Sequence, residues 1–359
     1  MDLTLTDERR AIRDAARDFL TDAASPDRVR AAVEGGTGFD ADLWRGLAIE
    51  MGFAGLIVPE AHGGAGLGAI DMALVLEETG RCLAPVPFFE TAVVAVTAVL
   101  AGGDAAQQAH YLPRLAAGAR VSVAGTADRP TFRAGRLTGS AGFATFAHVA
   151  ELILVATDDD RIVVLEADTP GLTVAPLPGL DRTRRFARLT FDCAVADGAV
   201  LARPGAMRQA MTIGAGLLAA EQTGAAQYSL DATVDYVKQR VQFGRTIGSF
   251  QAVKHMLADM MLLVEASRSA ALAAAAAIDM SDGAVDAERD AACHAARAYA
   301  SDAFRQVAAD AIQLHGGIGF TWEHHAHLYF KRARASATWL GTADAHREAL
   351  ARIILEDAA

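Results

Sequence analysis

The sequence predicts an α+β protein in which two helical segments flank a shorter β-rich segment. Residues 1 to about 118 and residues from about 206 onward carry apolar side chains at helical spacing. The residues between them form short β-branched runs bounded by Gly, Pro or Asp. We therefore expect three domains, covering residues 1–118, 119–205 and 206–359.

The first segment opens with "TDERRAIRDAARDFL", where Thr6 precedes two acidic residues and is expected to be a helix N-cap. The stretches "AIDMALVLEETGRCLA" and "AAQQAHYLPRLAAG" also have helical spacing. Between these helices lies the glycine-rich "VPEAHGGAGLG". No strand is expected before its glycines, which favours a tight helix connection over a dinucleotide-binding loop.

The middle segment contains the short runs "RVSVAGT", "ELILVATD", "RIVVLEAD" and "LTVAPL". In "ARLTFD", Ala187, Leu189 and Phe191 point to one face and the polar residues between them to the other. Residues 119–205 are therefore expected to form a small antiparallel barrel or sandwich.

The last segment is helical again. In "FQAVKHMLADMMLLVEASRS" the apolar residues recur at i, i+3 and i+4. The stretch "AVDAERDAACHAARAYASDAFRQVAADAIQLHGG" predicts one long helix that ends at Gly316 and Gly317. Alanine-rich helix faces of this kind pack closely in bundles and at oligomer interfaces.

Composition excludes several functional classes. A net charge of −11 argues against nucleic acid or an anionic membrane surface as the main partner. The three scattered cysteines indicate reduced thiols, and the charged N-terminus is not a signal peptide, so we expect a cytoplasmic protein. No stretch approaches the roughly 20 apolar residues of a membrane span. His324, His325 and His327 fit no metal-ligand spacing, so no metal site is expected.

The segment "YVKQRVQFGRTIGSFQAVKHMLADM" carries the strongest chemical signal. Arg240 and Arg245 flank an expected helix break at Phe243 and Gly244. Guanidinium donors and free backbone N–H groups near one turn suit an anion such as pyrophosphate. The residues alone fit a solvated basic face equally well.

This segment closely resembles the R-x-Q-F-G…F-Q signature of the acyl-CoA dehydrogenase family. The stretch "QLHGGIGFTWEHHAHLYFKRARA" resembles the second signature of that family, Q-x-x-G-G-x-G-(F/Y)-T, and "LWRGLAIEMGFAGLIVPEAHGGAGLG" its N-terminal segment. The resemblance covers essentially the whole chain. It implies the family's fold, with a C-terminal four-helix bundle, and an FAD-dependent oxidoreductase acting on CH–CH bonds in lipid metabolism. It further implies an acyl-CoA substrate, an electron-transfer flavoprotein as acceptor, and a tetramer of one chain or of two related chains.

The resemblance also implies FAD-binding residues. Arg240 would bind the FAD pyrophosphate. In the middle segment this chain departs from the family, because Ala127 stands where the family has an acidic residue. The other positions implied are Gln242, Phe243 and Gln251 on the adenosine side, Gln313, Gly316 and Gly317 from the neighbouring subunit, Thr342 and Asp344 at the adenine end, and Thr126, Phe143 and Thr145 around the flavin ring.

One position departs from the family. The catalytic glutamate of the family falls on Leu340 in "TWLGT", and a leucine side chain cannot accept a proton. Some relatives carry the catalytic glutamate at a second position, which falls near Gly214 here and also has no carboxylate. Glu221, two turns further along the same helix and about 10 Å away, is a weak substitute.

Three hypotheses about function stay open on the sequence alone. The chain is a dehydrogenase with its catalytic base elsewhere, a non-catalytic subunit of a heteromeric dehydrogenase, or a flavin oxidase or monooxygenase on the same fold.

Overall fold

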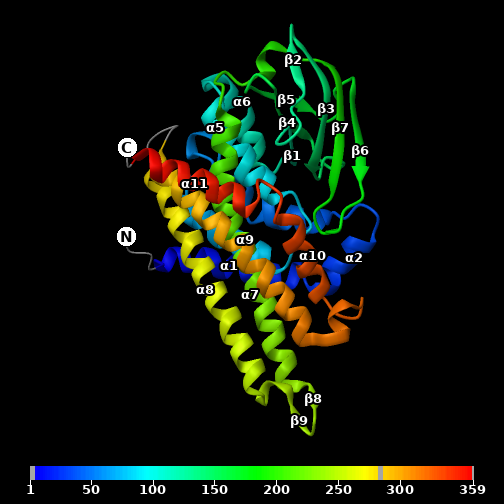
Figure 1. Cartoon of the computed structure of the whole chain (residues 1–359). Coiled ribbons are helices and arrows are strands. Elements are labelled where there is room, and N and C mark those ends of the chain that lie inside the picture. The colour runs from blue at the N-terminus through cyan, green and yellow to red at the C-terminus, as the bar shows by residue number, and fades with distance from the viewer. Residues whose placement is uncertain (1–4, 282–285, 358–359) are drawn as a thin grey trace.

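The computed structural model describes residues 5–281 and 286–357. Within this range a block of helices is followed by two β-sheets and then by a second block of longer helices (Figure 1). The order confirms the predicted α+β organisation.

The N-terminal block contains six α-helices joined by short turns. Thr6 caps the first of them, because its Oγ1 accepts a hydrogen bond from the N–H of Arg9 at 3.3 Å, as predicted. The glycine-rich segment before the fourth helix holds one 3₁₀ turn (Glu60–His62) followed by irregular backbone, with no strand among its described residues, so it is a helix connection. The helices are α1 (Asp7–Ala23), α2 (Pro26–Glu34), α3 (Ala41–Trp44), α4 (Ala69–Arg81), α5 (Val96–Gly102) and α6 (Ala105–Ala116), with π-helical turns at η1 (Arg45–Glu50) and η4 (Glu90–Ala95).

The middle segment forms two sheets. One has the strand order β1-β4-β5 and the other β2-β3-β7-β6. Buried and exposed residues alternate along β7, which confirms the predicted faces. The strands are β1 (Val121–Ala124), β2 (Thr131–Arg133), β3 (Arg136–Thr145), β4 (Leu152–Ala156), β5 (Ile162–Glu166), β6 (Leu172–Leu177) and β7 (Phe186–Ala194).

The sheets differ from the antiparallel expectation in one pairing, because β1 runs parallel to β4. Between these two strands the chain forms the β2–β3 pair in the other sheet and then returns. A connection of this kind brings a strand back in its original direction, whereas a tight hairpin would reverse it.

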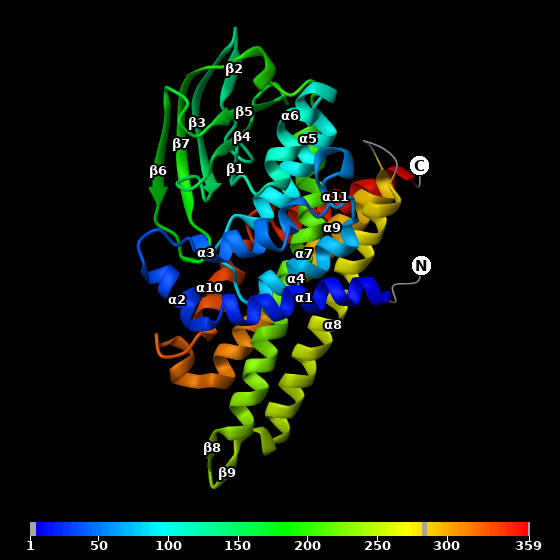
Figure 2. The ribbon, with the colours of Figure 1, turned by 180° about the vertical axis from the view of Figure 1, so that it is seen from behind.

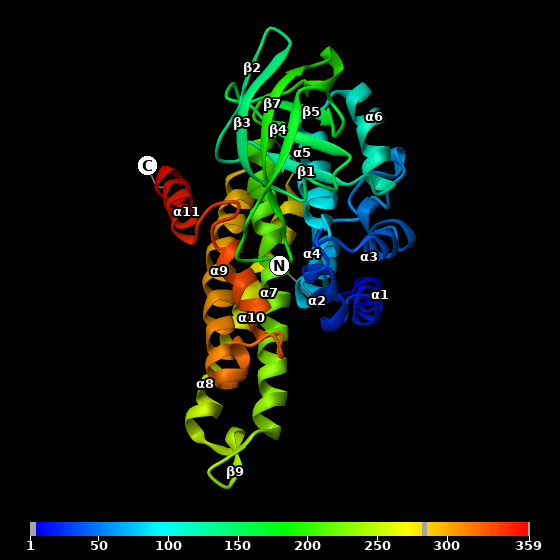
Figure 3. The same cartoon turned by 90° about the vertical axis from the view of Figure 1, so that its right-hand side faces the viewer.

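In the C-terminal block, three long helices lie side by side, and α10 and α11 both pack against α9 (Figures 1 and 3). Gly316 has a φ of +63° and ends α9, as predicted, while residues 284 and 285 of the expected helix lie outside the described residues. The elements are α7 (Ala206–Gln239), β8 (Val241–Gln242), β9 (Arg245–Thr246), α8 (Gln251–Met280), α9 (Ala287–His315), α10 (Ala326–Ser336) and α11 (Ala343–Asp357).

Helix α8 is long and apolar enough to cross a membrane, which corrects the expectation that no stretch approaches a span. Among the described helices it is the single one to meet that test. It packs against α7 and α9, and Met260 and Val264 on its inner face are buried. Core helices of bundles satisfy the same length and composition test, so the finding is weak evidence for a membrane span.

Helices α4 and α7 approach each other backbone to backbone through two glycines (Figure 2). A Cβ placed on Gly224 would lie 1.7 Å from the carbonyl oxygen of Glu77. A Cβ placed on Gly80 would lie 1.9 Å from the carbonyl oxygen of Glu221. The two glycines therefore set the separation of the helices, and with it the position of Glu221 in the core.

We expect Gly224→Ala to lower the free energy of unfolding by at least about 1–3 kcal/mol, because the new methyl group forces two rigid helix backbones apart. Urea titration followed by circular dichroism measures the change. Gly198→Ala is the matched control, because a Cβ at Gly198 meets no atom within 4 Å. Equal stability of the two variants would contradict the close contact.

Candidate active site

A cavity of about 770 Å³ opens between the middle sheets and the helices of the C-terminal block. The middle domain contributes one wall, and α7, α10 and the turn before α11 contribute the other. The lining residues are Thr126, Ala127, Phe143, Leu177, Pro178, Gly179, Leu180, Phe186, Met211, Arg334, Ala335, Thr338, Trp339, Leu340 and Gly341.

A β-bulge aims Phe143 into this cavity. The register of β3 against β7 breaks between Ala141 and Ala144, and Phe143 has a φ of +59°. The Phe143 side chain is 58% exposed and meets the ring of Phe186 edge to face at 6.2 Å. The bulge thus provides an open aromatic wall.

Thr145 lies deeper than the other predicted flavin contacts. Thr126 and Phe143 line the cavity, whereas Thr145 is 1% exposed and does not line it. Its hydroxyl makes no hydrogen bond of good geometry within the described part of the chain.

The turn that carries Leu340 is held by a buried arginine. Nη2 of Arg297 donates to the carbonyl oxygens of Ser336 at 2.6 Å, Trp339 at 2.8 Å and Gly341 at 3.3 Å. Leu340 has a φ of +59°, a conformation that few L residues adopt. Its N–H makes no hydrogen bond to the residues described here, so a backbone donor is left free beside the cavity.

Behind the cavity wall lies a cluster of buried ions, which we call the ion cluster: Asp181, Arg184, Glu221 and Arg332. Arg332 contacts Asp181 at 2.6 Å and Glu221 at 2.9 Å, and Arg184 contacts the second oxygen of Glu221 at 2.7 Å. Burial alone would raise the pKa of Glu221, but the two guanidiniums outweigh it and the pKa is lowered. With both oxygens paired, Glu221 fits a fixed counter-ion better than a proton acceptor.

Glu90 lies beside the ion cluster, and its pKa is shifted in the opposite direction to that of Glu221. It is fully buried, and neither carboxyl oxygen has a hydrogen bond of good geometry to the described residues. Burial raises the pKa of Glu90, against the lowering effect of Arg184, whose Nε lies 3.6 Å away, and of Thr145. Burial therefore shifts Glu90 toward its protonated form, in contrast to Glu221.

Arg184 connects the ion cluster to the cavity. Its guanidinium lies 4.2 Å from the ring centroid of Trp339, which lines the cavity, and Phe89 meets the same ring edge to face at 5.2 Å. The cluster thus fixes the aromatic side chain that precedes Leu340.

The predicted FAD signatures lie at the other end of the bundle. Hairpin β8–β9 extends away from the sheets, with Phe243 at its turn 91% exposed (Figures 1 and 3). Tyr236, one turn before Arg240, stacks on His315 at 4.5 Å, which brings the two signatures together. Within one chain these signatures do not reach the cavity. The exposed signature residues are Arg240, Gln242, Phe243, Gln251, Gln313, Gly316 and Gly317.

Thr342 and Asp344 lie at the cavity end instead. The hydroxyl of Thr342 accepts from the N–H of Ala345 at 3.2 Å, and Asp344 pairs with Arg347 at 2.9 Å. Thr342 directly follows Gly341 and precedes α11, whose second residue is Asp344.

The three clustered histidines form ring contacts near the signature end. Rings of His315 and His324 lie 4.3 Å apart, and Arg30 contacts Nδ1 of His325 at 3.0 Å. Burial, followed by neighbouring positive groups, lowers the pKa of His324 and of His327 to about 4. No group of three potential ligands is arranged to hold a metal ion in the residues that the structure describes.

A smaller cavity of about 210 Å³ shares Thr126, Met211 and Leu340 with the large one. Its remaining walls include His294 from α9 and His346 from α11. Neither histidine is a candidate from the sequence. His346 follows Leu340 by six residues, which is a signal that sequence reading could have used, whereas His294 joins the site only through the packing of α9.

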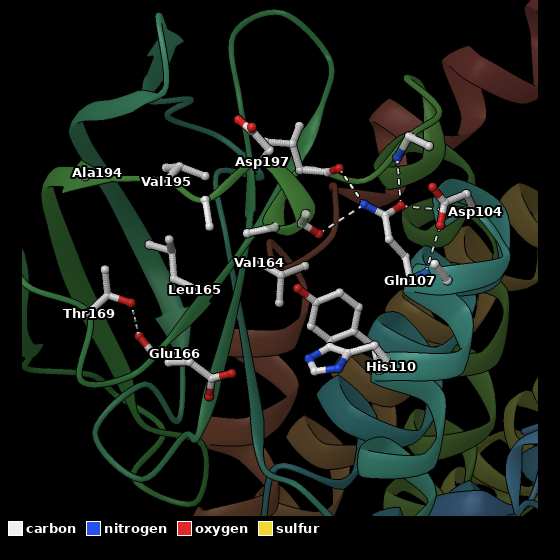
Figure 4. A pocket seen from close by; sticks show the side chains of 17 residues that line it. Asp104, Gln107, His110, Val164, Leu165, Glu166, Thr169, Ala194, Val195 and Asp197 are labelled. Carbon is white, nitrogen blue, oxygen red and sulfur yellow. Dashed lines mark hydrogen bonds between the residues drawn. The ribbon is translucent and has the colours of Figure 1, made fainter.

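A third cavity, of about 700 Å³, lies between α6 and the end of β7 (Figure 4). The Gln107 amide crosses it, donating to the carbonyl oxygens of Gly198 and Val200 and accepting from the N–H groups of Asp104 and Ala202. These bonds dock the middle domain on the N-terminal block.

Comparison with known proteins assigns both helical blocks. Residues 6–119 match the family model of the acyl-CoA dehydrogenase N-terminal domain, and residues 205–355 match that of the C-terminal domain. Acyl-CoA dehydrogenase IpdE2 of Mycolicibacterium smegmatis is 37% identical, over 98% of this chain and 99% of the relative.

Two solved structures are similar over 99% of this chain and 99% of theirs. One is a steroid ACAD variant, Tcur3481-Tcur3483, at 33% identity and a TM-score of 0.86. The other is the ChsE4-ChsE5 complex of Mycobacterium tuberculosis, at 26% identity and a TM-score of 0.91.

We expect replacement of Glu221 and of Glu90 by neutral glutamine to change the free energy of unfolding differently. Glu221→Gln leaves Arg184 and Arg332 short of a counter-charge and should lower the free energy of unfolding at pH 7 by about 3–5 kcal/mol. Glu90→Gln mimics the protonated acid and should not lower it.

The pH dependence has opposite signs too. Because the pKa of Glu90 is raised in the folded protein, its contribution to the free energy of unfolding falls as the pH rises above the ordinary pKa of a glutamate. Because the pKa of Glu221 is lowered, its contribution to the same free energy falls as the pH drops below that ordinary pKa. Urea unfolding of both variants from pH 4 to 8 tests this, and a loss at Glu90→Gln as large as at Glu221→Gln would contradict it.

Proposed function

Because the chain belongs to the acyl-CoA dehydrogenase family, we propose that it oxidises an acyl-CoA thioester between the α and β carbons with FAD as cofactor. The observation that carries the proposal is the cavity with the open aromatic wall of Phe143 on one side and the Leu340 turn on the other.

The residues at the signature end fit FAD. Arg240 is exposed and has no carboxylate partner among the described residues, although the chain holds 44 acidic residues. A Cβ on Gly316 or Gly317 would meet nothing within 4 Å, which leaves space for a ligand against the backbone. Arg240 would hold the pyrophosphate by charge-assisted hydrogen bonds, with Gln242, Phe243, Gln251 and Gln313 around it.

At the cavity end, bound FAD supplies an acceptor for the β-hydride. Phe143 would line the flavin ring together with Thr126, and Thr342 and Asp344 would stand at the adenine end. The free N–H of Leu340 would donate to the thioester oxygen and stabilise the charge that develops there when the α-proton leaves. Apolar residues of the cavity, such as Leu177, Leu180 and Met211, would exclude water.

The distance between the two ends supports a site shared by two chains. Arg240 and Gln313 of one chain would bind FAD in the cavity of its neighbour, which requires at least a dimer, and we propose a tetramer. Electrons would pass to an electron-transfer flavoprotein, in the cytoplasm.

A second candidate function is a non-catalytic subunit that pairs with a related chain. Leu340, at the position of the family's glutamate, favours it. The similar ChsE4-ChsE5 structure is a complex of two different chains.

One of the similar structures supports a choice of substrate class. The similar steroid ACAD makes a steroid-derived acyl-CoA the first compound to test. Apolar residues and aromatic rings on both sides of the cavity suit a bulky alicyclic acyl group.

We expect Arg240→Ala to weaken FAD binding by about 1.5–3 kcal/mol, the contribution of a hydrogen bond to a charged group. Fluorescence titration of the apoprotein with FAD measures the affinity. The control is Lys238→Ala, which removes an exposed cation two residues away. FAD bound at full affinity by a protein that light scattering shows to be monomeric would contradict the shared site.

Anaerobic titration with a panel of acyl-CoA thioesters, including steroid-derived ones, tests the reaction. We expect the 450 nm flavin absorbance to bleach with a suitable substrate when the chain is purified alone. Bleaching only after co-expression with a related, glutamate-bearing chain would favour the non-catalytic subunit instead.

A further inference from the structure

Two histidines form a hydrogen-bonded pair at the turn that lacks the glutamate. Nε2 of His346 lies 2.9 Å from the carbonyl oxygen of Leu340, and Nδ1 of His346 lies 2.8 Å from Nδ1 of His294. Both rings line the small cavity, which meets the large one at Thr126, Met211 and Leu340.

The hydrogen bonds determine which nitrogens carry protons. A carbonyl oxygen only accepts, so Nε2 of His346 carries the hydrogen that is donated to Leu340. In a neutral His346 ring, Nδ1 is then an acceptor, and Nδ1 of His294 must be the donor. Nε2 of a neutral His294 ring is therefore left with a free lone pair, and no hydrogen bond to the described residues occupies it.

Burial favours the neutral form of both rings. Burial is the largest cause that lowers the pKa of each ring, to about 4 for His346, where Arg297 of α9 adds to the effect. Asp290, on the same helix as His294, raises the pKa of His294 and partly offsets its burial.

Two further cations, Arg129 and Arg208, line the small cavity, from the loop after β1 and from α7. Arg129 pairs with Asp160 at 3.1 Å. Burial lowers the pKa of both histidines from 6.5, which favours a neutral resting pair with one free lone pair.

We propose that Nε2 of His294 accepts the α-proton of the acyl thioester in place of the absent glutamate, with His346 as the positioning residue that fixes its tautomer. This inference rests on the proposed function, because it requires an acyl thioester in the cavity. The α-carbon–hydrogen bond breaks, the proton goes to Nε2 of His294, and the electron pair stays on the substrate as the enolate. In the full oxidation, bound FAD would supply the two-electron oxidant for the β-hydrogen, and the electron pair of the enolate would form the α,β double bond.

The test uses (methylthio)acetyl-CoA and the FAD-loaded oligomer in D₂O. The sulfur in place of the β-carbon prevents hydride loss, so exchange of the α-hydrogens, followed by NMR, reports proton transfer without turnover. Binding is measured separately from the change in the flavin spectrum. We expect His294→Gln to bind the probe normally and to exchange about 10²–10⁴-fold more slowly.

His346 offers a matched pair of variants. Gln at this position can donate to Leu340 and accept from His294, so His346→Gln should keep exchange within a few-fold of the wild type. His346→Leu has neither group and should exchange at least about tenfold more slowly. A purely packing role of His346 would predict the reverse order, because leucine suits a buried site better than glutamine.

The pH profile and a rescue give independent readouts. Exchange by the wild type should fall as pH decreases through the lowered pKa of His294, below its ordinary 6.5, and His294→Gln should lose this step. Adding Leu340→Glu to His294→Gln should restore exchange, because it places a carboxylate on the same cavity wall.

The outcomes separate the two claims. A wild-type protein that binds the probe without exchanging, or a His294→Gln variant that exchanges at the wild-type rate, overturns the role of His294 and leaves the proposed function in place. A FAD-loaded wild type that does not bind the probe, and is not bleached by any acyl-CoA of the panel, overturns both. If His294→Gln does not take up FAD, the exchange rates of His294→Asn and His346→Leu are compared with that of the wild type instead, and wild-type rates in both would overturn the role of His294.

Discussion

The ion cluster is the constraint on which the rest of the site depends. It joins Asp181 and Arg184 of the middle domain to Glu221 of α7 and Arg332 of α10, and Arg184 also approaches Glu90 of the N-terminal block. Buried ions are costly to desolvate, so these charges are tolerable only when every partner is in place. Correct docking of the three parts of the chain is therefore a condition for satisfying the cluster, and the docked arrangement places Trp339 and the cavity wall.

Much of the fold followed from local patterns, and much of the site did not. Thr6 as a cap, the alternation along β7 and the end of α9 at Gly316 each depend on residues close in sequence, so a sequence reading could find them. The parallel β1–β4 pairing and the contacts of His294 depend on segments 31 and 52 residues apart. Glu221 looked like a spare carboxylate in the sequence, because nothing local shows that two arginines, 37 and 111 residues away, neutralise it.

The distribution of the predicted FAD residues has a physical consequence. Phe243 lies on the two-residue turn of the β8–β9 hairpin at the tip of the α7–α8 pair, with most of its ring in solvent, and Arg240 directly precedes β8. Phe243 has a φ of +55°, a strained conformation for an apolar L residue, and its ring meets Phe250 edge to face at 6.2 Å. Both the exposure and the strain of Phe243 are explained if the hairpin becomes buried against a neighbouring chain and its cofactor, as proposed. Assembly would then complete the site.

The turn at Leu340 is a strained backbone conformation that buried side chains hold in place. A β-region conformation would be easier for leucine than the observed φ of +59°, by roughly 1 kcal/mol or more. Three hydrogen bonds from Arg297 and one from His346 nevertheless hold the backbone in this shape. The result is a free N–H beside the cavity and a carbonyl that would fix the tautomer of the proposed histidine pair. This geometry supports the two proposals made for the turn, that the N–H of Leu340 serves as an oxyanion donor and that His294 takes the place of the usual base.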